Sequence, residues 1–249
     1  MTCEACRTIP PVISEGYEPK GTSSVIGELG FRTYVTGPPT SKTAIFSIYD
    51  IFGNSPQTTQ GADILSSTLN CLVLIPDFFD GDGAKHEWVP PDNEEKQKLL
   101  MEFVQTKASF GKAASSIPDL VSAYKKQFPS VERWGAYGLC WGGKVLALSS
   151  GEGTPFSGTV QVHPGRMDVA DVQTLSIPHA ILASKDEPVK DVEAYDELIN
   201  KKGLGGYVET YETMWHGWMG ARADLVKEES LKEYIRGYKQ LADFFEKYL

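Results

Sequence analysis

The sequence predicts an α/β fold with a mostly parallel central sheet flanked by helices, and two observations carry that prediction. Segments typical of strands alternate along the chain with segments typical of helices, the order that builds parallel sheets. Residues 71–77, CLVLIPD, form a continuous apolar run of strand length, as expected of a strand covered on both faces. With 249 residues and no internal repeat or linker, we expect a single domain over residues 1–249.

The expected elements follow from residue type and periodicity. Strands rich in β-branched and aromatic residues are expected at 31–36, 43–50, 71–77, 133–138, 156–164, 179–186 and 207–212. Helices are expected at 58–69, 94–128, 189–203 and 224–249, with breaks in the second near Gly111 and near Pro118. Residues 77–93 are rich in turn formers and predict a long loop at a strand's carboxyl end, where open α/β sheets bind ligands.

Composition and charge narrow the classes of partner. The net charge is −9, and no cluster of lysine and arginine suggests a phosphate-binding face, so we expect no nucleic-acid partner. No run approaches the roughly 20 apolar residues of a membrane span. The first 20 residues lack the apolar core of a secretory signal, so we expect a cytoplasmic protein with no membrane partner.

The four cysteines do not predict a metal site. Cys3 and Cys6 form a CxxC pair, but a zinc site needs a second ligand pair, and the histidines show no HxxxH spacing. Structural or incidental roles are therefore favoured over metal or redox roles for this pair. Cys71 opens an apolar run and is expected to be a small buried hydrophobic residue.

Cys140 lies in a different setting, between an apolar strand and a helix in the segment AYGLCWGGKVLALSS (136–150). The pattern Gly-x-Cys-x-Gly-Gly predicts a sharp strand-to-helix turn that lifts the thiol above the sheet, with glycines where side chains would clash. The helix that begins at Trp141 directs unpaired N–H groups at this turn, which favours the reactive thiolate. The Trp141 N–H can also donate to a developing oxyanion.

A nucleophile elbow of this kind is followed along the chain by an acid and then a base. Asp186 ends the expected strand at 179–186, and Glu187 is the alternative acid, less favoured because its side chain is expected to point to the other side. Of the histidines after Cys140, only His216 follows both acids. His163 also ends a strand, and a structural role is favoured for it.

These motifs together resemble the dienelactone hydrolase family of α/β-hydrolases, particularly its fungal members. The resemblance is carried by YDIFG (49–53), PD (76–77), GLCWGG (138–143), SKDEP (184–188) and HG (216–217), and covers nearly the whole chain. It implies an α/β-hydrolase fold, a triad of Cys140, Asp186 and His216, and no cofactor; the spacing of cysteines and histidines already predicts no metal. The implied activity is that of a carboxylesterase or lactonase acting on a small-molecule ester, lactone or thioester through a thioester acyl-enzyme.

The resemblance also assigns supporting roles. The backbone N–H of Ile51 matches the second oxyanion donor. Asp50 matches a glutamate that modulates the thiol in bacterial members. The two arginines that bind the substrate carboxylate in those members are absent here at the matching positions, with Arg222 a candidate replacement and Lys85 a weaker one.

We expect aromatic residues in loops after strand ends to line the substrate site and to favour neutral substrates. The predicted lining residues are Phe52, Phe78, Phe79, Trp88, Trp141, Trp215 and Trp218. A homodimer is a further possibility. Two other functional classes remain open. The protein could be a binding protein that keeps this fold without catalytic activity, or a redox sensor that uses the Cys140 thiol.

Overall fold

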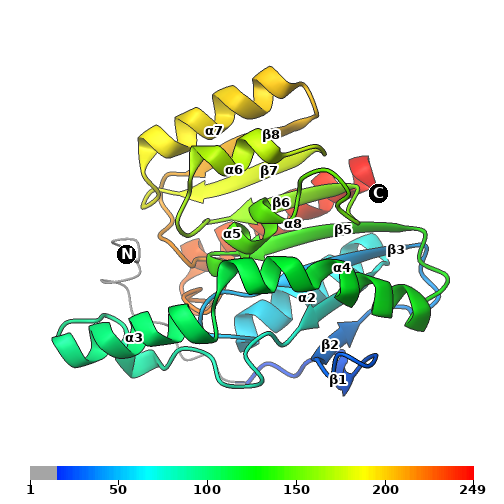
Figure 1. Ribbon diagram of the computed structural model, residues 1–249, viewed down its shortest axis with the longest axis horizontal. Helices are drawn as coiled ribbons and strands as arrows, with labels where there is room; N and C mark the ends of the chain where they lie inside the picture. Colours follow the sequence, from blue (N-terminus) through cyan, green and yellow to red (C-terminus); the bar gives the residue numbers. More distant parts are fainter. Residues whose placement is uncertain (1–15) are drawn as a thin grey trace.

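An eight-stranded sheet runs through the computed structural model, which describes residues 16–249 (Figure 1). Its strands are β1 (Thr22–Val25), β2 (Arg32–Thr36), β3 (Thr43–Ile48), β4 (Leu72–Pro76), β5 (Arg133–Leu139), β6 (Gly158–Val162), β7 (His179–Ser184) and β8 (Gly206–Tyr211). The order is β1-β2-β4-β3-β5-β6-β7-β8; β2 pairs antiparallel with β1 and β4, and the other neighbours are parallel. The predicted α/β fold class is confirmed, while the predictions for Cys3 and Cys6 lie outside the described residues.

Helices cover both faces of this sheet. α2 (Pro56–Leu69) and α8 (Glu228–Tyr248) pack together on one face, and α4 (Phe110–Gln127), α5 (Trp141–Leu148), α6 (Val169–Thr174) and α7 (Val189–Lys202) cover the other (Figure 1). The short helix η1 (His86–Trp88) and α3 (Glu94–Thr106) extend from the end of the sheet. Within residues 16–249, no helix combines the length and apolar character needed to cross a bilayer.

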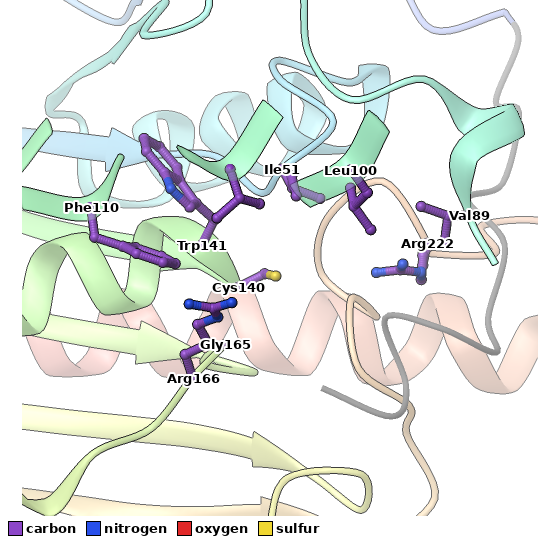
Figure 2. A pocket seen from close by; sticks show the side chains of 10 residues that line it. Ile51, Val89, Leu100, Phe110, Cys140, Trp141, Gly165, Arg166 and Arg222 are labelled. Carbon is purple, nitrogen blue, oxygen red and sulfur yellow. The ribbon is translucent and has the colours of Figure 1, made fainter. Parts of the chain in front are cut away.

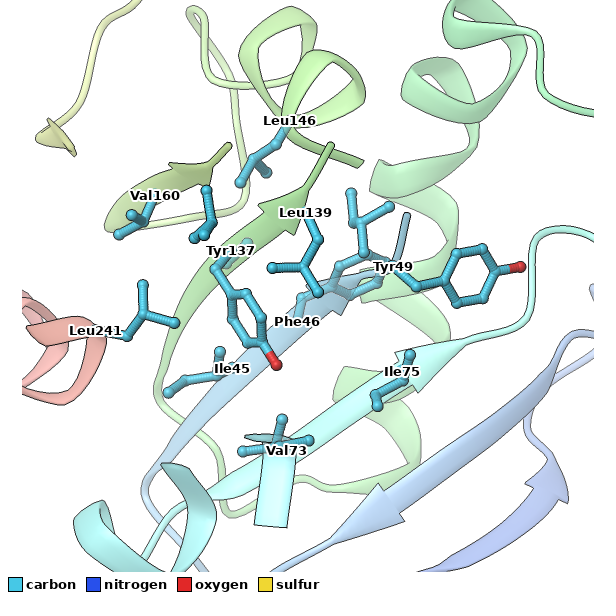
Figure 3. Close-up of a cluster of buried hydrophobic side chains, with 14 of the residues drawn as sticks. Ile45, Phe46, Tyr49, Val73, Ile75, Tyr137, Leu139, Leu146, Val160 and Leu241 are labelled. Carbon is cyan, nitrogen blue, oxygen red and sulfur yellow. The ribbon is translucent and has the colours of Figure 1, made fainter. Parts of the chain in front are cut away.

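The central strands are buried on both faces, as the continuous apolar runs predict. Ile45 and Phe46 are consecutive, so their side chains point to opposite faces of the sheet, yet both are fully buried (Figure 3). Val73 and Leu74 on β4 are likewise consecutive and fully buried. Burial of each such side chain stabilises the folded state by roughly 1.5–3 kcal/mol relative to leaving it exposed to water. This two-sided burial holds the carboxyl ends of β3, β5, β6 and β7 rigidly side by side.

Three local features differ from the sequence-based expectations. β1 was not expected, because its four residues are all exposed and form an edge strand without an apolar pattern. α6 was not expected because it has only six residues. The predicted break near Pro118 is wrong: α4 continues through it, and the interruption falls before Phe110. The apolar face of α4, which includes Ile117 and Val121, is buried, and this packing outweighs the backbone hydrogen bond that proline cannot make.

Candidate active site

Cys140 occupies the turn between β5 and α5 with backbone angles φ 50° and ψ −106°. A non-glycine residue in this region of φ costs of order 1–3 kcal/mol, and such strain is typical of functional sites. The turn is held by two backbone hydrogen bonds, from Cys140 N–H to Val162 O (3.1 Å) and from Gly165 N–H to Cys140 O (3.0 Å). The predicted strand–cysteine–helix turn is therefore present.

Two glycines allow the chain to fold this tightly. A Cβ atom on Gly138 would lie 2.2 Å from the Gly142 carbonyl oxygen. A Cβ atom on Gly142 would lie 2.3 Å from the Ile48 carbonyl oxygen. Both contacts are with backbone, which cannot rotate away, so the close approach of α5 to β3 and β5 requires glycine at both positions.

The two residues expected to supply the oxyanion donors, Trp141 and Ile51, lie directly after Cys140 and after β3, respectively. Trp141 is the first residue of α5, where backbone N–H groups have no acceptor inside the helix. Ile51 lies in a turn after β3 that is closed by hydrogen bonds from Phe52 N–H to Asp50 Oδ1 (2.9 Å) and from Gly53 N–H to Asp50 O (3.1 Å). Ile51, Cys140 and Trp141 line the same cavity.

His216 lies in the loop between β8 and α8 and is buried. Its ring Nδ1 is 2.6 Å from Oε1 of Glu187, and both side chains are 1% exposed. The other carboxylate oxygen of Glu187 accepts a hydrogen bond from the Ser184 N–H. The Asp186 carboxylate instead accepts the backbone N–H of His216 at 2.9 Å.

The prediction that Asp186 orients the His216 ring is therefore wrong, and Glu187 occupies that place. The prediction assumed that side chains continue to alternate through residue 187, as in a strand. β7 ends at Ser184 and a turn follows, so alternation no longer applies. The turn folds Glu187 back over the strand end, while the shorter Asp186 reaches only the backbone of the histidine loop.

Asp50 was expected to modulate the Cys140 thiol, and the structure gives it another role. Within residues 16–249, its side chain accepts hydrogen bonds from the N–H groups of Phe52 (2.9 Å) and Ala221 (2.7 Å), and none joins it to the Cys140 sulfur. Burial raises the pKa of Asp50, and the two N–H donors oppose this shift. Asp50 thus ties the turn after β3 to the loop that carries His216.

A cavity of about 40 Å³ opens onto Cys140, whose side chain is almost wholly enclosed (Figure 2). Three residues, Val89, Leu100 and Val104, come from the segment containing η1 and α3, which forms one wall. Among the described residues that line the cavity, the charged side chains are Arg166 and Arg222, and in the view of Figure 2 the Cys140 sulfur lies between them. The remaining lining residues are Ile51, Phe110, Trp141 and Gly165.

Most of the aromatic residues predicted to line the site do not reach this cavity. Trp141 does, but Phe78 and Phe79 pack against it and against Tyr49 as a second layer, with ring centroids 4.7–6.2 Å apart. Trp88 packs on Phe103. Rings at strand ends bury most apolar area against one another, so they form core rather than a binding surface.

The other predicted aromatic residues support the histidine loop. Trp218 is fully buried and packs on Tyr211, with ring centroids 4.2 Å apart. Trp215 donates its ring N–H to the backbone oxygen of Arg222 at 3.0 Å. The Arg222 guanidinium lies over the ring of Phe52, 5.0 Å from its centroid. The contacts of Trp215 and Phe52 thus position Arg222, while Trp218 packs in the core.

The expected replacement arginine, Arg222, does line the cavity, whereas Lys85 is exposed and pairs with Asp82. Arg166 was missed by the sequence analysis. It follows β6 by four residues, so the rule that ligands bind at the carboxyl ends of strands was a usable signal. Its guanidinium lies 5.7 Å from the centroid of Phe110, another lining residue.

The strained cysteine between β5 and α5, the acid after β7 and the histidine after β8 define an α/β-hydrolase. Residues 31–249 match the model of the dienelactone hydrolase family. An uncharacterized AIM2 family protein of Schizosaccharomyces pombe is 34% identical over 87% of each chain. The human carboxymethylenebutenolidase homolog is 25% identical over 88% of each chain.

The solved structures agree with this fold. A dienelactone hydrolase from Anabaena variabilis matches with a TM-score of 0.66 at 11% identity, covering 93% of this chain and 98% of that one. The chain belongs to the dienelactone hydrolase family, and its resemblance to fungal members is confirmed by the yeast relative. It is an ester or lactone hydrolase of this type.

Proposed function

We propose that the protein hydrolyses a small carboxylic ester or lactone with Cys140 as nucleophile, His216 as base and Glu187 as the acid that orients the histidine. The observation that carries this proposal is the buried His216–Glu187 contact of 2.6 Å, at the edge of the sheet where the strained Cys140 turn lies. In this arrangement the Glu187 carboxylate accepts a hydrogen bond from the protonated Nδ1 of His216. The other ring nitrogen, Nε2, is then unprotonated and can act as the base.

The chemistry follows from these positions. His216 takes the Cys140 proton, and the thiolate attacks the substrate carbonyl carbon. The N–H groups of Trp141 and Ile51 donate to the oxyanion. The carbon–oxygen bond of the ester breaks, His216 protonates the leaving oxygen, and a thioester remains on Cys140. His216 then deprotonates a water that attacks the thioester, releasing the acid and restoring the thiol.

The cavity lining favours a substrate that carries an anionic group. Most of the aromatic residues that suggested neutral substrates lie behind the cavity, and Arg166 and Arg222 are the charged residues among its described lining. A carboxylate entering an apolar cavity needs a cationic partner, and arginine binds carboxylates through paired N–H groups. We therefore propose a carboxylate-bearing ester or lactone as the preferred substrate.

Arg222→Gln is expected to lower the kcat/KM for a carboxylate-bearing ester by about 10- to 100-fold, because the variant loses a hydrogen bond between two charged groups. The kcat/KM for the matched methyl ester should change by less than about threefold, because no charge is then paired. Arg133→Gln, at the other end of β5, is the control. Equal losses for both esters would contradict anion recognition by Arg222.

A tryptophan at position 100 is expected to block the cavity. Leu100 is buried and lines it, whereas the next residue, Met101, is 61% exposed. Leu100→Trp should lower kcat/KM by about tenfold or more, because a side chain of that size has no room beside the cavity. Met101→Trp on the same helix is the matched control. Unchanged kinetics in a folded Leu100→Trp protein would show that substrate enters elsewhere.

The proposed activity is tested by a screen of matched neutral and carboxylate-bearing esters and lactones, with Cys140→Ala as the inactive control. Turnover that Cys140→Ala abolishes supports it, and a mass increase on the Cys140 peptide after acid quench identifies the acyl-enzyme. Absence of turnover across the screen, in a protein whose Cys140 still reacts with iodoacetamide, favours a binding or redox-sensing role on this fold.

A further inference from the structure

His163 is a second histidine beside His216 that the proposed chemistry does not use. It follows β6 directly, and its side chain is fully buried. Its ring lies edge-to-face on the His216 ring, with centroids 5.1 Å apart and planes at 66°. The backbone at His163 has φ 37°, in the left-handed region that few side chains adopt.

The surroundings of the His163 ring are those of an aromatic group rather than of a hydrogen-bonding one. Among the described residues, neither ring nitrogen has a hydrogen-bond partner. His179, which is equally buried, differs because its Nδ1 lies 2.8 Å from the Thr159 hydroxyl. Burial lowers the pKa of His163 well below 6.5, and the positive charges of His216 and Arg222 add to the shift. The His163 ring is therefore neutral near pH 7.

The backbone links His163 to the reacting groups. Cys140 N–H donates to Val162 O, the residue before His163, and Gly165 N–H donates to Cys140 O. His163 N–H donates to Leu182 O on β7, the strand that leads to Glu187. The His163 backbone is thus fixed to the strand ends that carry Cys140 and Glu187, and the His163 ring packs against the His216 ring.

We propose, on the basis of the function proposed above, that His163 is a positioning residue for His216. Its ring confines the His216 imidazole to the orientation that joins Glu187 to Cys140. Because the His163 ring is neutral, its π system stabilises the imidazolium that forms when His216 takes a proton, whereas a charged neighbour would repel it. The other charged groups that face this pair are Glu187 on the His216 ring, Arg222, and Asp50 beneath the histidine loop.

The test compares His163→Phe, which keeps an aromatic ring, with His163→Ala and His163→Asn, which do not. His163→Ala is expected to lower kcat by about 30-fold or more with KM within about threefold, since a misplaced base slows the reaction without weakening binding. His163→Phe should stay within about fivefold of the wild-type kcat, because the ring contact is retained. His179→Asn, a buried histidine away from the site, should leave kcat unchanged. His163→Asn replaces the alanine variant if the latter does not fold.

A second readout does not depend on the substrate. The rate of Cys140 alkylation by iodoacetamide is followed against pH by mass spectrometry of the Cys140 peptide, with His216→Ala as the uncoupled reference. The His163→Ala profile should move toward that of His216→Ala, and the His163→Phe profile should remain with the wild type. These changes in the pH profile of alkylation support the positioning role of His163 even if the protein hydrolyses no ester. In that case only the proposed hydrolase activity is contradicted.

Two results would overturn the inference. One is a His163→Ala or His163→Asn protein with wild-type kcat and a wild-type alkylation profile, which would leave the ring without a positioning role. The other is a His163→Phe protein as impaired as His163→Ala in both measurements, which would assign the role to a ring nitrogen instead of to the aromatic ring.

Discussion

Glutamine at position 187 is expected to lower kcat by about 10³-fold or more, because a neutral amide neither holds the His216 tautomer nor stabilises the imidazolium. The structure places the Glu187 carboxylate on the His216 ring, and both groups are almost completely buried. The measurement is kcat at saturating substrate between pH 7 and pH 8, with circular dichroism to confirm folding.

Asp186→Asn is the matched control for this experiment, since the two acids are adjacent in the chain. Its side-chain oxygen can still accept the His216 backbone N–H, so kcat should fall by less than about tenfold. The reverse ranking, with Asp186→Asn inactive and Glu187→Gln active, would show that Asp186 orients the ring during turnover, as the sequence pattern predicted.

Serine at position 140 is expected to lower kcat/KM by about 10³-fold or more, although it keeps a nucleophilic atom at the turn. A thiol forms its anion beside a histidine and a helix N-terminus far more readily than a hydroxyl does. The measurement is kcat/KM for the best ester from the screen, with Cys140→Ala setting the background. A serine variant as fast as the wild type would refute catalysis by a thiolate.

Cys71→Ala provides the control for general thiol effects. Cys71 is buried before β4, and burial raises the pKa of its thiol to about 12, so it stays protonated and inert. Removing it should leave kcat unchanged. A loss of activity in a folded Cys71→Ala protein would mean that the effect of Cys140→Ser does not report on the nucleophile alone.

Features that depend on neighbouring residues were predictable from the sequence. The elbow at Cys140 follows from local sterics, because glycine is required where the backbone of Gly138 approaches that of Gly142. The buried strands follow from continuous apolar runs, and the choice of His216 follows from the order of groups along the chain. Edge strand β1 and the six-residue α6 were missed because such short segments carry little periodic signal, and β1 is also exposed throughout.

The sequence by itself determined the fold class and the strand–cysteine–helix turn, and it supplied the prediction of Cys140 and His216 as catalytic groups, since backbone sterics and hydrophobic periodicity act over a few residues. Only the tertiary structure showed that Glu187 contacts the His216 ring while Asp186 contacts the His216 backbone, because a turn after Ser184 ends the strand alternation. It alone showed that Arg166 and Arg222 line the same cavity and that most of the predicted aromatic residues pack in the core. Those outcomes depend on how residues far apart in the chain fill space together, and no local pattern encodes that packing.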